Sequence, residues 1–506
     1  MTNTNMHEQT IRALQAWQQW QAEYLPDTVL DESIQAKGPR VLEYSEFVVT
    51  EINRNPEIFQ CLLETDVLGK TFSPSISPTA FKPDLTGDER DFMVALRRFR
   101  KLHMLWIYWR DLSDDADLEE TFAHISWLAD ECLNMALSWA HSFSCQRFSI
   151  APESLSPLLI MAMGKYGAEE LNVSSDIDLI FCYDDSQPLT GRLRALELFY
   201  TQVGRKLIQL LDQRTADGFV FRVDMRLRPY GDSGPLVMSQ SAMESYYLEQ
   251  GRDWERFAMI KARFVTGDET QIDELYGILK PFVYRRYVDF SVLEAPRKMK
   301  RLIESEVRRR NLGTNIKLGA GGIREVEFFA QALQLIHGGR EPRLQSRELL
   351  ATLKVIAELD LVAVDSALHL EEAYRFLRKL EHRLQAYKDE QTQILPDSDT
   401  DCERLARSMG FDTWTECESA IQFHREHVNC IFADLFATEE ATASNTDLQY
   451  EDFWLADDGA YDFAVLAPLG EEQSKAFANH LQHFKTESSI RNMGPRGSKV
   501  LDELMP

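Results

Sequence analysis

LLIMAMGKYGAEELNVSSDIDLIFCY, residues 158–183, decides how the rest of the chain is interpreted. The apolar run Leu158–Met163 stops at Gly164, which is typical of a buried strand. A second run, DIDLIFCY, begins at Asp176 and is rich in the branched and aromatic residues that favour strands. Because strand side chains alternate between faces, Asp176 and Asp178 are predicted to point the same way. Two neighbouring carboxylates repel each other unless a hard cation such as Mg²⁺ lies between them, so the pattern predicts a metal site.

A third carboxylate follows in the stretch FVFRVDMRLRP, residues 219–229, which is also predicted to be a strand. Its alternation puts four polar side chains on one face: Arg222, Asp224, Arg226 and Arg228. The aspartate would complete the metal site, and the arginines would hold phosphate because a guanidinium fork matches phosphate oxygens. Two aspartates in a strand more often form a solvated face, but the Gly-Lys turn, the SSDID context and the arginine-flanked aspartate together favour a catalytic site.

The stretch GKYGAEELNVSSDIDLIF resembles the glycine-to-DxD signature of the nucleotidyltransferase fold, which DNA polymerase beta shares. More narrowly, it resembles the glutamine synthetase adenylyltransferase/adenylyl-removing family, and the resemblance covers about Gly164 to about Pro396. Tyr166 and Ala168 stand where the family pattern leads us to expect Leu and Gly. The similarity continues through four further stretches: DMRLRPYGDSGPLV, YYLEQGRDWERFAMIKAR, FVYRRYVDFSVLEAPRKMK and NIKLGAGGIREVEFFAQALQLIHGGREPRLQSR.

The resemblance implies a predominantly helical α+β protein with a mixed nucleotidyltransferase sheet between N- and C-terminal helical bundles. It implies the adenylyl-removing half of a bifunctional enzyme, in which orthophosphate attacks the AMP-tyrosine of glutamine synthetase and ADP is released. The full-length enzyme would also adenylylate the same tyrosine from ATP. Mg²⁺ is the implied cofactor. A PII-class signal protein and glutamine are the implied regulators, in the control of nitrogen assimilation.

The implied site has three parts. Asp176, Asp178 and Asp224 would be the catalytic metal ligands. The nucleotide and phosphate would contact Gly164, Lys165, Ser174, Ser175, Arg226 and Arg228. A glycine-containing segment before a helix predicted to start at about Ile323 would add Lys317, Gly321, Arg324, Glu325 and Glu327, with Lys261 from a nearby stretch. A glycine run before a helix can instead be only a turn, and Lys261 can equally well balance the acidic surface.

The charge of the chain favours a protein substrate. Acidic residues outnumber basic ones by 81 to 55, giving a net charge of −26. This argues against nucleic acid and against an anionic membrane surface as partners. The seven cysteines form no CxxC pair, and the sequence shows neither a secretory signal nor an apolar run long enough to span a membrane. We therefore expect a cytoplasmic protein.

The chain is predicted to divide into a helical region at 1–145, a catalytic domain at 146–290, a helical bundle at 291–436 and a linker at 437–506. The linker would lead to a second nucleotidyltransferase half that is absent from this chain. Aromatic residues at helical spacing near the N-terminus predict core packing. The two HxxH pairs, His424/His427 and His480/His483, lack a third ligand at suitable spacing and are predicted to face solvent.

Two other functions stay open. An ATP-dependent nucleotidyltransferase that modifies a protein would consume ATP, whereas the adenylyl-removing reaction would produce ADP from a modified protein. A non-catalytic regulatory binding module would fail to bind Mg²⁺ and nucleotide.

Overall fold

The structure is a computed structural model that describes residues 2–186, 193–285 and 313–433. The chain splits into two compact units, Met1–Asn429 and Cys430–Pro506, and the account below concerns the first. The predicted fourfold division stays a prediction. The predicted linker at 437–506 and the His480/His483 pair lie outside the described residues. No helix of the described ranges is long and apolar enough to cross a membrane.

Six α-helices precede the sheet: α1 (Thr2–Tyr24), α2 (Glu32–Tyr44), α3 (Glu46–Arg54), α4 (Pro56–Glu64), α5 (Glu89–Leu112) and α6 (Leu118–Phe148). The aspartates that precede α5 and α6 cap them, because each side chain accepts a hydrogen bond from a backbone N–H of the first turn. Trp17 stacks on Trp20 with ring centroids 5.6 Å apart, and both are buried. The predicted aromatic core is confirmed, whereas the aliphatic residues Ile11 and Leu14 of the same helix are exposed.

The sheet has five strands: β1 (Leu159–Met163), β2 (Asp176–Tyr183), β3 (Arg222–Asp224), β4 (Val237–Ser239) and β5 (Arg263–Phe264). β1 pairs antiparallel with β2 and with β5, whereas β3 and β4 both pair parallel with β2. Ile177, Leu179 and Phe181 of β2 are buried in the main core. Because side chains alternate along a strand, Asp176 and Asp178 lie on the other face.

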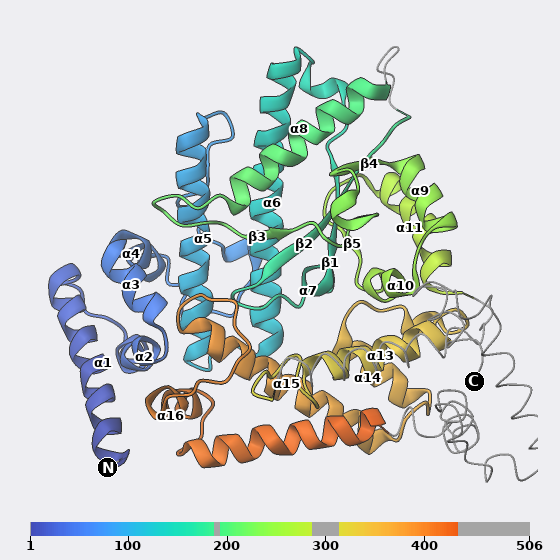
Figure 1. The fold of residues 1–506 in the computed structure, drawn as a ribbon. Coiled ribbons are helices and arrows are strands. Elements are labelled where there is room, and N and C mark those ends of the chain that lie inside the picture. Colours follow the sequence, from blue (N-terminus) through green and yellow to red (C-terminus); the bar gives the residue numbers. More distant parts are fainter. Residues whose placement is uncertain (1, 187–192, 286–312, 434–506) are drawn as a thin grey trace, which may run out of the picture. The chain divides into compact units, whose positions relative to one another are not determined.

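The remaining helices surround this sheet (Figure 1). Within and after it come α7 (Gly164–Gly167), α8 (Leu193–Asp212), α9 (Gln240–Glu249), α10 (Asp253–Met259), α11 (Glu269–Val283), α13 (Ile323–His337), α14 (Leu349–Glu358), α15 (Val364–Ala386), α16 (Asp399–Ser408) and a helical stretch at 414–433. Short 3₁₀ turns occupy Pro74–Ile76, Pro152–Ser154, Gly231–Ser233 and Pro342–Leu344. α8 packs against β3, β4 and α6. The predicted predominantly helical α+β fold is confirmed.

The third predicted strand is much shorter than expected. The prediction placed it at 219–229, but β3 ends at Asp224. There the Asp224 carboxylate accepts a hydrogen bond from the backbone N–H of Arg226, 2.8 Å away. An aspartate that bonds the backbone two residues ahead turns the chain and competes with strand pairing. The predicted continuous face from Arg222 to Arg228 is therefore wrong beyond Asp224.

Candidate active site

The pairing of β2 with β3 brings the three predicted aspartates together. Asp178 is the register partner of Asp224, and Asp176 is the partner of Arg222. Register partners on adjacent strands point to the same face, and Asp176 joins them because it lies two residues before Asp178. A parallel pair needs a crossover connection, which α8 provides here. Two carboxylates close in sequence thus meet a third that is about 46 residues away only because of the fold.

The turn after β1 closes one side of this carboxylate group. Gly164 has a φ of +56°, a conformation that favours glycine. A Cβ atom at this position would also lie 2.8 Å from Oδ2 of Asp178. Any larger residue would therefore be strained and would push against the carboxylate. Gly164, which directly follows β1, therefore allows the turn to approach Asp178 closely.

The electrostatics of the group fit a cation. Burial, followed by the charges of Asp176 and Asp224, raises the pKa of Asp178 to about 7. Burial also acts to raise the pKa of Asp224, but hydrogen bonds from Arg226 outweigh it and the pKa is lowered. A divalent cation would neutralise this repulsion, and three carboxylates are the oxygen ligands that Mg²⁺ prefers.

Two neighbours currently bind the carboxylates. The guanidinium of Arg226 forms a two-pronged ion pair with Asp224, and Gln391 donates to Oδ1 of Asp176 at 2.8 Å. In the described part of the chain, no three His, Cys, Asp or Glu side chains are grouped closely enough to hold a metal ion. The three carboxylates are the type of ligand that Mg²⁺ prefers, but in this arrangement Asp224 is paired with Arg226, whose side chain is 75% exposed, and the three are not grouped closely enough to hold the ion.

Arg228 is turned away from this group. Its Nη1 donates to the carbonyl oxygen of Met225 at 2.6 Å, and it lies 3.6 Å from the carboxylate of Asp232. The predicted pair of phosphate-binding arginines is thus not formed, because the chain turns after β3. Of the two arginines, Arg226 is the one that hydrogen-bonds to a carboxylate of this group, although the charge of Arg228 also acts to lower the pKa of Asp224.

A cavity of about 560 Å³ opens next to Asp178. One side, here called the strand wall, comes from the β1–α7 turn and from β2, and its lining residues are Gly164, Lys165 and Asp178. The other side, the helix wall, comes from α10 and from the segment around α13. Predicted residues on the helix wall are Lys261, Lys317, Arg324 and Glu327, and aromatic ones that the prediction missed are Trp254, Phe257 and Phe328.

A buried ion network joins the two walls. Glu327 lies 2.9 Å from Nζ of Lys165 and also forms an ion pair with Lys261, which is 3.6 Å from Glu170. Burial, and then the charge of Arg378, lower the pKa of Lys165 to about 7. Burial acts to lower the pKa of Lys261 too, but Glu327 and Glu170 outweigh it and the pKa is raised. As the pH rises, Lys165 is therefore expected to lose its proton before Lys261 does.

Helix α15 supports this network from behind, and no local pattern in the sequence predicts this role. Arg378 is fully buried and donates to the carbonyl oxygen of Glu170 at 2.6 Å and to Oδ1 of Asn172 at 2.5 Å. Tyr374 receives a hydrogen bond from Lys165 at 3.1 Å and donates to Glu170 at 3.0 Å. These partners are about 200 residues apart, so no local pattern predicts them.

The loop after α15 reaches the metal group through a second long-range contact. Asp389 is buried and bonds to Arg100 at 2.9 Å and to Tyr108 at 3.1 Å, both on α5. Gln391, two residues later, donates to Asp176. The N-terminal helices thus position a residue at the carboxylates, although the prediction assigned them only a packing role.

Three of the predicted site residues, Gly321, Glu325 and Ser174, make contacts that stabilise the fold and do not line the cavity. A Cβ atom on Gly321, whose φ is +68°, would overlap the carbonyl oxygen of Arg425, and Glu325 accepts from the Gly321 N–H at 2.9 Å. Both therefore stabilise a turn and do not line the cavity. Ser174 is buried, and its hydroxyl accepts from Arg222 at 3.1 Å. Ser175 is half-buried just before β2.

The predicted solvent-facing pair His424/His427 is half-buried. His424 stacks on Phe376 of α15, with ring centroids 4.5 Å apart, and His427 lies against His369. In the described ranges, neither histidine belongs to a group of three or more His, Cys, Asp or Glu side chains that could hold a metal ion.

Two family models match the chain. Residues 37–275 match the model described as glutamate-ammonia ligase adenylyltransferase. Residues 297–436 match the model described as GlnD PII-uridylyltransferase. The first match contains the three aspartates, Gly164, Lys165 and Lys261. It also contains Trp254 and Phe257 of the helix wall. The second contains Lys317, Arg324, Glu327 and Phe328 and all of α15, so the cavity is lined by residues from both matched regions.

Proposed function

We propose that the chain is a nucleotidyltransferase of the glutamate-ammonia ligase adenylyltransferase type and that it removes AMP from a tyrosine of glutamine synthetase by phosphorolysis. An oxygen of orthophosphate attacks the α-phosphorus of the AMP-tyrosine. The bond from phosphorus to the tyrosine oxygen breaks, ADP leaves, and the tyrosine oxygen takes up a proton. The observation that carries the proposal is that three carboxylates share one face of β2 and β3, and that one of them, Asp178, lines a cavity whose walls also carry cations.

The aspartates and the cations have separate roles. Asp176, Asp178 and Asp224 would hold Mg²⁺, which when bound offsets charge on the transferring group and the leaving oxygen. Lys317 and Arg324, on the helix wall, would bind phosphate oxygens of the two reactants. Arg226 would move from Asp224 to the incoming phosphate. Lys165 and Lys261 are buried around Glu327 and position the two walls.

The cavity suits a nucleotide attached to a protein. Its volume of about 560 Å³ falls in the range of ligand pockets, about 300–1,000 Å³. Trp254 is partly exposed and offers an apolar surface, and Phe257 stacks on Phe328 with centroids 5.0 Å apart. The net charge of −26 favours a protein over a nucleic acid as the carrier of the AMP group. A PII-class protein would regulate the reaction, which would take place in the cytoplasm.

The direction of the reaction rests on the resemblance of residues from about 164 to about 396 to the adenylyl-removing half of the family. The alternative is adenylylation of the same tyrosine from ATP. Both directions use the same metal-assisted displacement at phosphorus, so the carboxylates serve either one.

One experiment separates the directions. The chain is incubated with adenylylated glutamine synthetase, Mg²⁺ and phosphate, and ADP is measured. In parallel it is incubated with unmodified synthetase, Mg²⁺ and ATP, and AMP attachment is measured. We expect ADP in the first reaction and little labelling in the second. Efficient labelling without ADP production would reverse the proposed direction, and inactivity in both with no nucleotide binding would favour a regulatory module.

A further inference from the structure

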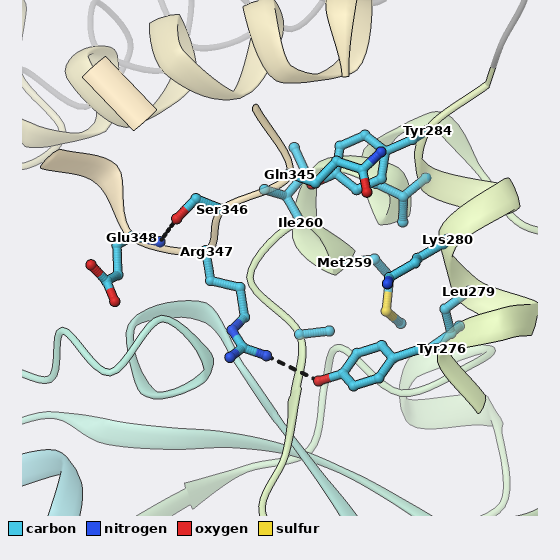
Figure 2. A pocket seen from close by; sticks show the side chains of 12 residues that line it. Met259, Ile260, Tyr276, Leu279, Lys280, Tyr284, Gln345, Ser346, Arg347 and Glu348 are labelled. Atoms are coloured by element: carbon cyan, nitrogen blue, oxygen red, sulfur yellow. Dashed lines mark hydrogen bonds between the residues drawn. The ribbon is translucent and has the colours of Figure 1, made fainter. Parts of the chain in front are cut away.

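A second cavity, of about 340 Å³, lies between α11 and the segment that precedes α14 (Figure 2). It shares no lining residue with the active-site cavity. One short stretch of the chain, residues 259–262, lines both cavities. Lys261 lines the active-site cavity, whereas Met259, Ile260 and Ala262 line the second one. This second cavity is therefore a separate space that borders on the helix wall.

The cavity is rich in hydrogen-bond donors. Arg347 donates to the hydroxyl oxygen of Tyr276 at 3.0 Å, as Figure 2 shows, and the backbone N–H of Phe264 donates to the same oxygen at 3.3 Å. The Tyr276 hydroxyl oxygen thus accepts two bonds, and its own proton is left to donate. The hydroxyl of Tyr284 is buried and has no hydrogen-bond partner among the described residues. Burial raises the pKa of Tyr284, so that hydroxyl also stays a donor.

The cations of the cavity are not neutralised. Within the described ranges, neither Lys280, which is exposed, nor Arg347, which is half-buried, forms an ion pair with a carboxylate. Glu348 also lines the cavity, but Figure 2 shows its carboxylate turned away from Lys280 and Tyr276. This is unusual in a chain with 26 more acidic than basic residues. The Tyr284 hydroxyl is the buried donor without an acceptor, which costs about 1–3 kcal/mol, so the arrangement favours an acceptor that enters from outside.

We propose that this cavity binds a small molecule that carries an oxyanion, a carboxylate or a phosphate, on an apolar body. The anion contacts the guanidinium of Arg347, the ammonium of Lys280 and the two tyrosine hydroxyls. The guanidinium fork matches two oxygens of either group. The apolar body lies against Met259, Ile260, Leu279 and Val283, which also line the cavity. The volume falls within the range of small-molecule pockets, about 300–1,000 Å³.

The position of the cavity links it to the active site. The carbonyl oxygen of Lys261 packs so closely on α7 that a Cβ atom on Gly167 would overlap it. The Lys261 side chain forms an ion pair with Glu327. A ligand that shifts the stretch 259–262 therefore moves both the turn that holds Gly164 and the network that joins the walls. An occupant of the cavity should change the rate of the reaction, and this part of the inference rests on the proposed function.

The binding test uses phenyl phosphate, benzoate and neutral benzamide as probes, titrated calorimetrically into the full chain. We expect at least one of the two anions to bind and benzamide to bind about tenfold more weakly or not at all, since it lacks the charge. The anion that binds more tightly identifies the oxyanion. Arg347→Gln and the conservative Tyr284→Phe should each weaken binding, by about tenfold for the arginine. Arg343→Gln, an exposed arginine of the same segment that pairs with Glu341, is the matched control.

Arg324→Gln separates the two cavities, because Arg324 lines only the active site. Probe binding should survive Arg324→Gln and be weakened by Arg347→Gln. The inference is overturned if neither anion binds, or if Arg324→Gln and not Arg347→Gln removes binding. In the ADP assay, the anion that binds should change the rate of the wild-type chain but not of Arg347→Gln. If the chain produces no ADP at all, the proposed function fails while the calorimetric result still decides the binding site.

Discussion

The two walls of the active-site cavity are built in different ways. The strand wall comes from one sheet, where pairing of β2 with β3 fixes Asp178 beside Asp224. The helix wall comes from α10 and α13, and it is joined to the strand wall by the buried ion pairs of Glu327. A sheet register sets side-chain direction through backbone hydrogen bonds, whereas an ion network depends on every partner being present. The proposed metal ligands therefore lie on the wall that the backbone holds, and buried ion pairs join the other wall to it.

Asp178→Asn gives the largest expected effect on activity. The amide keeps the volume of the side chain but removes one negative charge from the group that would hold Mg²⁺. We expect ADP production to fall about a thousandfold or more while the thermal melt stays close to that of the wild type. Asp232→Asn, at an exposed aspartate after β3, is a suitable control and should stay active. Near-normal ADP production by Asp178→Asn would show that the strand wall does not hold the metal.

Glu327→Gln tests the helix wall and should act mainly on stability. It leaves Lys165 and Lys261 buried without their shared carboxylate. Breaking a buried ion pair by removing one partner costs about 3–5 kcal/mol. Denaturant unfolding should show this loss in the free energy of unfolding. Glu341→Gln, which breaks an exposed pair with Arg343, should cost less than about 1 kcal/mol. Equal losses for the two variants would mean that the network does not join the walls.

The difference between the walls also explains what the sequence predicted. The strands β1 and β2 and the start of α13 follow from apolar runs and a glycine stop, and Asp176 and Asp178 follow from strand alternation. The end of β3 did not follow, because the Asp224 side chain turns the chain and alternation alone cannot show that. The contacts of Gln391 with Asp176 and of Arg378 with Glu170 join segments about 200 residues apart. No single stretch of sequence contains both partners of such a contact.

The resemblance to a family supplied part of what local patterns could not. It implied Lys317, Arg324 and Glu327 as site residues, and all three line the cavity. It also implied Gly321 and Glu325, which do not line the cavity. Glu325 accepts a hydrogen bond from the N–H of Gly321, and the two residues stabilise the turn before α13. On a helix, neighbouring residues point in different directions, so a motif that spans a helix start includes both cavity and packing residues.

The network should give stability a pH dependence through Lys165. Its folded pKa of about 7 lies below the usual lysine value of about 10.4, so the unfolded chain binds more protons between these values. Stability from this group is therefore lowest below pH 7 and increases as the pH rises from about 7 to about 10. Lys165→Met removes the group, so the melting temperature of the wild type should rise relative to the variant across this window. A constant difference between the two melting curves would contradict the low pKa.

The smallest expected effect separates two arginines that the sequence placed on one face. Arg226 is 75% exposed beside Asp224, whereas Arg228 is 13% exposed and held by Met225 and Asp232. Lysine cannot form the two-pronged contact that a guanidinium makes with phosphate. Arg226→Lys should therefore raise the Michaelis constant for phosphate by about tenfold, because such contacts are worth about 1.5–3 kcal/mol. Arg228→Lys should leave that constant unchanged and cost only a little stability. Equal increases for both variants would mean that the turn after β3 straightens when phosphate binds, so that both arginines join the strand wall.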